Sequence, residues 1–207
     1  MKTPIFIHNP KAASTSIRRT LPRIVTAKID SRSSHYHIHQ VLDSAFIQNQ
    51  IRRRGLNGWS FGVVRHPLDR LVSAFHFFKE PRGRTVRENY VMESIFEGLT
   101  LNEFVMAVNF EKISKYAPHF RRQSLYLVPQ KQGSRKPDQI LRFENLDADF
   151  TTLCLNLEMN TTPELQHRFK TKKRRAWEEE LQGKALDKAM AYYRDDFTLF
   201  SYETPQT

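Results

Sequence analysis

The chain has 207 residues, 39% of them hydrophobic, with 15 phenylalanines, which is enough apolar material to bury the core of one domain and excludes a disordered chain. Its formal net charge is +11, from 33 lysines and arginines against 22 aspartates and glutamates, so we expect an anionic partner: a nucleic acid, a nucleotide or an acidic polysaccharide. The single cysteine, Cys154, excludes an internal disulfide framework and a cysteine-rich zinc site and fits a reducing compartment. We interpret it as a small buried hydrophobic residue.

The amino terminus leads directly into the first predicted strand. Residues 1–4 leave no room for the apolar stretch of a signal peptide. No window approaches the run of about 18 apolar residues that a transmembrane helix needs. We therefore expect a cytoplasmic protein with no transmembrane segment, organised as one domain over residues 1–207.

The first predicted strand, Ile5–Ile7, ends at a turn that is suited to binding an anion. An Asn-Pro step breaks the strand, Lys11 supplies a positive charge, and two alanines and three hydroxyl residues follow at 12–16. The hydroxyls are expected to cap the helix predicted over residues 17–24. A strand, a tight turn and a helix start present backbone N–H groups and the helix dipole to a phosphate or a similar anion. The Walker sequence is absent, because no glycine precedes Gly55, and this disfavours ordinary nucleoside triphosphatase chemistry.

Three histidines alternate along the next segment. His35, His37 and His39 are expected on one face of an extended stretch, with Tyr36 and Ile38 on the other. A histidine there could serve as a general base near neutral pH. The same spacing also permits a zinc site or a solvated surface strand. A helical pattern covers the following residues, up to Arg53.

The second predicted strand, Trp59–Val64, repeats the junction of strand and helix. Arg65 directly follows this strand, and a helix is predicted over Leu71–Lys79. Ligands of open α/β sheets bind where the carboxyl ends of strands meet the helices, so Lys11 and Arg65 are expected to converge on one crevice. The hydroxyl of Ser73 could then hold the same phosphate as the Arg65 guanidinium.

Later elements complete an alternation of strands and helices. A Thr-x-x-Glu capping box at 100–103 predicts a helix start, and a very basic segment occupies 168–175. The remaining predictions are an apolar run at 125–128, a third strand at 139–143, a helix at 147–157 and a last helix at 177–195. This order predicts an α/β fold with a central, mainly parallel sheet of about five strands flanked by helices.

Two stretches together resemble the sulfotransferases, specifically the carbohydrate type that includes heparan sulfate 2-O-sulfotransferase and short bacterial relatives. FIHNPKAASTSI resembles their 5′-phosphosulfate loop, and FGVVRHPLDRLVSAFHFF resembles their 3′-phosphate motif. HFRRQ, DQILRFENLDADF and YYRDDFTLFSYE are similar to later landmarks in the usual order, so the resemblance covers nearly the whole chain. One departure is Ala13-Ser14, where many relatives have a glycine pair. The resemblance implies a phosphate-loop-like fold and 3′-phosphoadenosine 5′-phosphosulfate (PAPS) as the sulfuryl donor, with 3′-phosphoadenosine 5′-phosphate (PAP) as the product.

The resemblance also implies roles at the donor. Lys11 would hold the oxygen that bridges sulfur and phosphorus and would stabilise the leaving phosphate. Arg65 and Ser73 would hold the 3′-phosphate. Apart from the resemblance, the basic segment 168–175 is either a solvated face or a contact for an anion, and in the second case Lys172, Lys173 and Arg174 would approach the nucleotide or an acidic acceptor. The 5′-phosphate would be held by the loop residues Ala12, Ala13, Ser14, Thr15 and Ser16.

The predictions for the acceptor and the general base depend on the histidine segment. Tyr36-His37-Ile38-His39 resembles the Tyr-His-Gly-His segment of heparan sulfate 2-O-sulfotransferases, which implies His39 as the base and His37 as an assisting or acceptor-binding residue. His119 and Gln123 could face the acceptor, and His8 and His66 are the reserve candidates for the base. We expect in-line transfer, without a metal, to a hydroxyl of an acidic or neutral glycan.

Two other functions are compatible with parts of the pattern. A nucleotide-dependent phosphotransferase could use the same loop, but it would need magnesium. A nucleic-acid-binding module is suggested only by the charge, and the sequence shows no recognised reader motif, so we expect no nucleic-acid partner.

Overall fold

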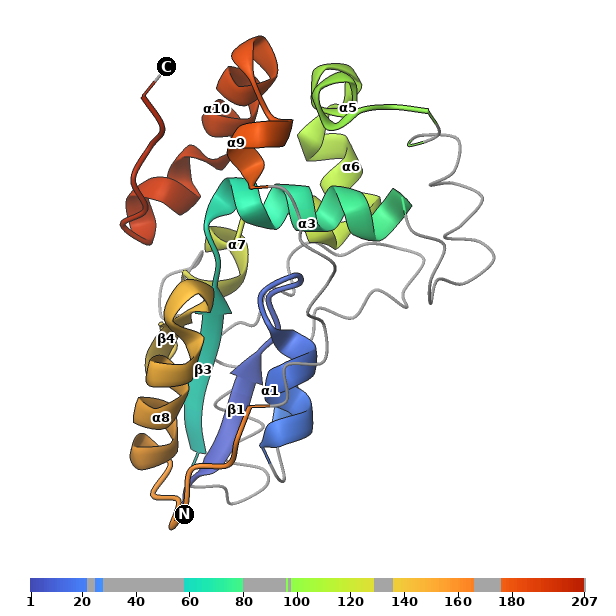
Figure 1. The fold of residues 1–207 in the computed structure, drawn as a ribbon. Helices are drawn as coiled ribbons and strands as arrows, with labels where there is room; N and C mark the ends of the chain where they lie inside the picture. The colour runs from blue at the N-terminus through green and yellow to red at the C-terminus, as the bar shows by residue number, and fades with distance from the viewer. Residues whose placement is uncertain are drawn as a thin grey trace. The chain divides into compact units, whose positions relative to one another are not determined.

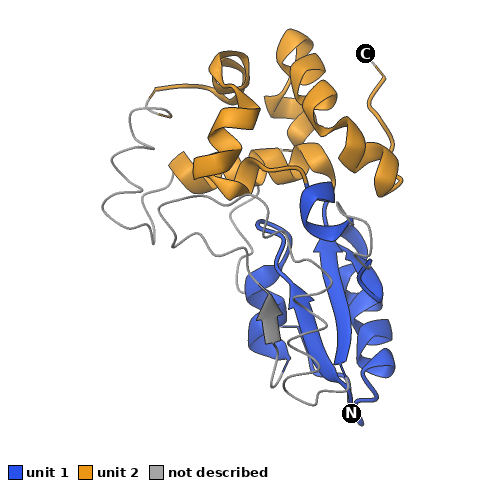
Figure 2. Ribbon diagram, turned by 180° about the vertical axis from the view of Figure 1, so that it is seen from behind, with its two compact units in different colours: residues 1–65, 123–170 blue, residues 66–122, 171–207 orange. Residues whose placement is uncertain are grey.

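The computed structural model describes residues 1–21, 58–79, 96, 98–128, 136–165 and 176–206, together with the backbone of 25–27. The chain divides into two compact units, coloured separately in Figure 2: unit 1 comprises Met1–Arg65 and Gln123–Lys170, and unit 2 comprises His66–Arg122 and Thr171–Thr207. Each unit is assembled from two separate stretches, so the division does not split the sequence into an amino-terminal and a carboxyl-terminal domain.

Unit 1 is built around a parallel sheet. Its strands lie in the order β2-β1-β3-β4, and each neighbouring pair is parallel. They are β1 (Thr3–Ile7), β2 (Val25–Ala27), β3 (Gly58–Val64) and β4 (Gln139–Arg142). The described residues thus form four strands where we expected about five, and three of them were predicted from the sequence. The parallel sheet with helices against it confirms the predicted α/β fold class.

Helices of unit 1 flank this sheet. Figure 1 shows α1 beside β1 and α8 beside β3 and β4. The helical segments are α1 (Ser14–Thr20), α7 (Ser124–Leu127), the short 3₁₀ turn η2 (Phe143–Asn145) and α8 (Leu146–Asn156). The core between sheet and helices includes Phe6 and Phe61, whose rings stack with centroids 5.2 Å apart, and Ile17 of α1 and Leu153 of α8.

Unit 2 is helical and has an aromatic core. Its elements are α3 (Pro67–Lys79), α5 (Leu101–Ala107), α6 (Phe110–Tyr116), η1 (Pro118–Phe120), α9 (Trp177–Glu180) and α10 (Gly183–Leu199). Phe75, Phe96, Phe104 and Phe120 are buried together, and the Phe96 and Phe104 rings stack with centroids 4.6 Å apart. The predicted capping box is confirmed, because the Thr100 side chain accepts from the Glu103 backbone and the Glu103 side chain from the Thr100 backbone.

The prediction of one last helix over 177–195 was wrong. The segment forms two helices, α9 and α10, interrupted at Leu181 and Gln182, and α10 continues to Leu199. Gly183, at the start of α10, has a φ angle of 54°, in the left-handed region that an α-helix does not use. The hydrophobic pattern continues across this glycine, so periodicity alone did not show the break.

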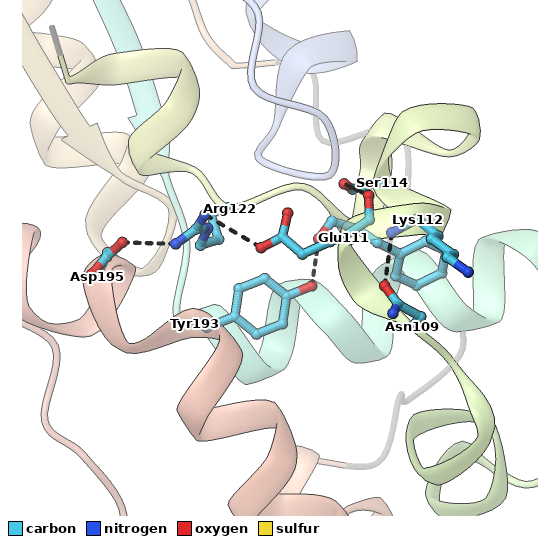
Figure 3. A network of polar contacts seen from close by, with 8 residues as sticks. Asn109, Glu111, Lys112, Ser114, Arg122, Tyr193 and Asp195 are labelled. Atoms are coloured by element: carbon cyan, nitrogen blue, oxygen red, sulfur yellow. Dashed lines mark hydrogen bonds and ion pairs between the residues drawn. The ribbon is translucent and has the colours of Figure 1, made fainter. Parts of the chain in front are cut away.

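A polar network joins the helices of unit 2 around Arg122. Figure 3 shows its guanidinium between two carboxylates: Nη1 lies 2.9 Å from Oδ2 of Asp195 in α10, and Nη2 lies 3.4 Å from Oε1 of Glu111 in α6. The Tyr193 hydroxyl donates to the backbone oxygen of Phe120 at 2.8 Å. These bonds fasten the segment 120–122 between α6 and α10.

Candidate functional site

The loop between β1 and α1 contains two residues with positive φ, a feature that it shares with anion-binding turns. Lys11 and Ala13 have φ angles of 68° and 55°, in the left-handed region, and Ala12 between them has no positive φ. Alternation of this kind turns successive backbone N–H groups toward one concave side. Ala12 is fully buried and Lys11 half-buried, so the loop is anchored to the core while it carries the lysine.

The helix cap differs from the prediction. The N-cap of α1 is Ala13, which makes no side-chain cap hydrogen bond, and none of the three predicted hydroxyl residues occupies the cap position. The Ser14 hydroxyl instead donates to the backbone oxygen of Asn9 at 3.0 Å and closes the loop. The first turn of α1 contains no acidic residue, and its last turn carries Arg18 and Arg19. The amino-terminal end of α1 therefore has no carboxylate of its own to compete with a bound anion.

A buried amide network connects the ends of β1 and β3. Asn9 Nδ2 donates to the backbone oxygen of Val63 at 2.9 Å and to Oε1 of Gln123 at 2.8 Å. Gln123 Oε1 also accepts from the Arg65 backbone N–H at 2.9 Å, and Gln123 Nε2 donates to the Arg65 carbonyl at 2.7 Å. Both amide side chains are fully buried. The loop with Lys11 and the segment with Arg65 are thus held to each other within unit 1.

The Arg65 side chain lies against the next strand end. Its guanidinium carbon is 4.3 Å from the centroid of the Phe143 ring, in the 3₁₀ turn that follows β4. A guanidinium over an aromatic face is stabilised electrostatically and keeps its planar face oriented. Arg65 is half-buried, so part of its surface still meets solvent. The carboxyl ends of β1, β3 and β4 contribute Lys11, Arg65 and the ring that supports Arg65.

Other predicted residues belong to unit 2. Ser73 lies in α3 with 2% of its surface exposed. His119 stacks on Phe77, with ring centroids 4.9 Å apart. His66 is enclosed by aromatic rings whose centroids lie 5.5 to 5.6 Å away, those of Trp177, Phe197 and Tyr202.

The histidine segment and the basic segment lie outside the described residues. They include these predicted residues: His35, His37, His39, Lys172, Lys173 and Arg174. Within the described ranges, no group of three or more histidines, cysteines, aspartates or glutamates could hold a metal ion. None of the described helices is both long and apolar enough to cross a membrane.

Sequence reasoning did not anticipate the roles of Asn9 and Gln123. Asn9 was interpreted only as a strand breaker, and Gln123 was proposed to face the acceptor. The structure buries both side chains and engages the Gln123 amide with the backbone of Arg65. The available sequence signal was their position, since Asn9 lies two residues after the end of a strand and Gln123 is the last residue of the HFRRQ landmark.

The comparisons with known proteins show the family of this chain. Searches of the curated proteins and of the solved structures found no significant match to this chain. The family model described as "Sulfotransferase family" matches residues 5–203, a range that contains the Lys11 loop, Arg65 and α10. The match favours sulfuryl transfer over the phosphotransferase alternative. The chain belongs to the sulfotransferase family.

Proposed function

We propose that the protein transfers the sulfuryl group of PAPS to a hydroxyl group of an acceptor. The observation that carries this proposal is the position of Lys11 and Arg65, which follow the carboxyl ends of the adjacent parallel strands β1 and β3. Ligands of open α/β sheets bind at such ends. One cation after each of two adjacent strands fits a donor that carries two separate anionic groups.

At the donor, Lys11 contacts the oxygen that bridges sulfur and phosphorus and stabilises charge on the leaving phosphate. The backbone N–H groups of residues 12–16 bind the 5′-phosphate. Thr15 and Ser16 are the hydroxyls assigned to it, because the Ser14 hydroxyl is already bonded within the loop. Arg65 and Ser73 bind the 3′-phosphate, and the basic residues Lys172, Lys173 and Arg174 contact the nucleotide.

On the acceptor side, we assign His39 as the base that removes the hydroxyl proton, with His37 assisting and His119 contacting the acceptor. A base of this kind should titrate near neutrality, as histidine does. The aromatic rings around His66 favour His39 over that reserve candidate. The net charge of +11 supports a glycan acceptor, above all an acidic one.

Titration calorimetry with PAP and with adenosine 5′-phosphate tests the donor. We expect binding of PAP and at least about tenfold weaker binding of adenosine 5′-phosphate, because a second charge-assisted phosphate contact is lost. Equal affinity for the two nucleotides, or no binding of either, contradicts the assignment of PAPS.

Two substitutions then test the chemistry. Lys11→Ala should abolish sulfuryl transfer, whereas Lys2→Ala is the matched control, since Lys2 adjoins the opposite end of β1 with its ammonium 4.7 Å from the Trp59 ring centroid. His39→Ala should abolish turnover but keep PAP binding, and wild-type turnover in that variant would refute the base. Turnover should persist in a metal chelator, while a phosphotransferase would lose activity there.

A further inference from the structure

The Gln123 side chain takes the place of a neighbouring strand at Arg65. The sheet pairing of β3 with β4 ends at Val64, which lies opposite Arg142, so the backbone of Arg65 is the first beyond the ladder. Gln123 supplies both missing partners, with 2.9 Å to the Arg65 N–H and 2.7 Å to its carbonyl. Because the bonds engage both backbone groups of one residue, they fix its main chain in position and orientation.

The orientation of both amides follows from this arrangement. A backbone N–H can only donate and a carbonyl can only accept, so Gln123 must place Oε1 and Nε2 as observed. Gln123 Oε1 and the Val63 carbonyl are both acceptors, so Asn9 must turn its Nδ2 group, and not its oxygen, toward them. The network therefore has one consistent arrangement, and both of its side chains are fully buried.

The location of these bonds in the chain gives them a second consequence. Arg65 is the last residue of the first stretch of unit 1, and Gln123 is the first residue of the second stretch. The hydrogen bonds between Gln123 and Arg65 therefore connect the residue at which the chain leaves unit 1 with the residue at which it returns. Through Gln123, Arg65 is connected to the loop that carries Lys11, because Asn9 is part of that loop.

We propose that Gln123 and Asn9 are positioning residues that set Arg65 against the Lys11 loop and so determine the preference for a nucleotide with a 3′-phosphate. The inference rests on the proposed function, in which Lys11 and Arg65 hold the two anionic groups of one donor. The ribose joins these two groups and limits the range of distances between them. A scaffold that holds the two protein cations within that range favours this nucleotide over one that lacks the second phosphate.

The test compares Gln123→Met with the wild type in calorimetry with PAP and with adenosine 5′-phosphate. Methionine keeps much of the volume of glutamine and removes its strong donor and acceptor. We expect PAP affinity to fall by about tenfold or more with the affinity for adenosine 5′-phosphate nearly unchanged, because only the second phosphate contact is displaced. A folded Gln123→Met variant with the wild-type ratio of affinities overturns the proposal.

A matched control lies at the opposite end of the same sheet. Gln139, at the start of β4, accepts from Asn156 Nδ2 at 2.8 Å and so forms a second amide pair in unit 1. Gln139→Met should leave the ratio of the two affinities unchanged. If the wild type itself binds both nucleotides equally, the proposed function fails, and this result is distinct from an unaltered ratio in the variant.

Gln123→Glu keeps the test decisive if the methionine variant does not fold. Below its titration midpoint the glutamic acid side chain can donate to the Arg65 carbonyl through its hydroxyl, and above it the carboxylate faces that carbonyl without a proton. At each pH, the affinity for PAP is divided by the affinity for adenosine 5′-phosphate, both for this variant and for the wild type. The ratio of the variant, relative to that of the wild type, should rise as the pH falls. A flat profile refutes a positioning role for Gln123.

Discussion

Replacement of Ala13 by glycine should stabilise the protein. Ala13 has φ 55° and ψ 14°, a left-handed conformation in which the Cβ of an L-residue is crowded. Relief of this crowding should stabilise the folded protein by about 1–2 kcal/mol. Glycine also makes the unfolded chain more flexible, which lowers the free energy of unfolding by about 0.4–1 kcal/mol. Glycine is also the better N-cap, and Ala13 is the N-cap of α1. At the middle of these two ranges, the net gain in the free energy of unfolding is about 0.8 kcal/mol.

The neighbouring alanine provides the matched control. Ala12 has no positive φ, and its side chain is fully buried in the core of unit 1. Ala12→Gly should therefore lower the free energy of unfolding by about 1 kcal/mol or more, through the lost methyl group and the backbone entropy. Urea denaturation followed by circular dichroism measures both variants, and heating should show a rise of about 1–4 °C in Tm for Ala13→Gly.

The two substitutions are expected to have opposite signs although they are chemically identical and adjacent. If Ala13→Gly destabilises the protein as much as Ala12→Gly does, the left-handed conformation at Ala13 is wrong. The proposed convergence of backbone N–H groups in this loop would fail with it, because it depends on the same φ angle.

Three further experiments test other parts of the structure. Gly62→Ala should lower the free energy of unfolding in urea denaturation by about 1–3 kcal/mol, since its Cβ would overlap the Leu127 side chain. The double variant with Leu127→Ala should lose less than the sum of the two single losses, because the smaller side chain removes the overlap. Hydrogen bonds from the backbone and hydroxyl of Thr100 lower the pKa of Glu103 in the folded protein. The capping box therefore stabilises the fold fully above the pKa that Glu103 has in the unfolded chain. This contribution is lost as the pH falls through the lower pKa of the folded protein. Glu103→Gln should remove that part of the acid dependence in denaturation series from about pH 7 to about pH 3. Burial raises the pKa of the Cys154 thiol, so alkylation by iodoacetamide at neutral pH should be slow in the folded protein and complete in denaturant; fast alkylation of the folded chain would contradict its burial.

The sequence predicted the elements whose signals are local. Strands β1, β3 and β4 follow from short apolar runs bounded by turn residues, and the helix after β3 follows from its period. This helix begins at Pro67, four residues before its predicted start, because proline is favoured in the first turn. The break before α10 was missed because it depends on the conformation of one glycine, Gly183, inside an otherwise continuous pattern.

The capping of α1 shows where a local signal was insufficient. Three consecutive hydroxyl residues offered three equivalent caps, and composition could not choose among them. The structure shows that the Ser14 hydroxyl is instead bonded to Asn9, five residues earlier, across the closed loop. Closure of the loop places Ala13 at the cap, in a conformation that alanine rarely adopts.

Residues that hold a site together are harder to find from sequence than residues that touch a ligand. Lys11 and Arg65 stand out because each is a cation that follows a strand within a few residues, whereas a lone glutamine is usually exposed. Gln123 lies 58 residues from Arg65 and 114 from Asn9, so no periodic pattern connects them. The need for such a residue is nevertheless predictable, because buried backbone N–H and C=O groups beyond the end of a strand must form hydrogen bonds. When a polar side chain supplies these hydrogen bonds to the backbone of a binding residue, it can affect binding although it does not touch the ligand.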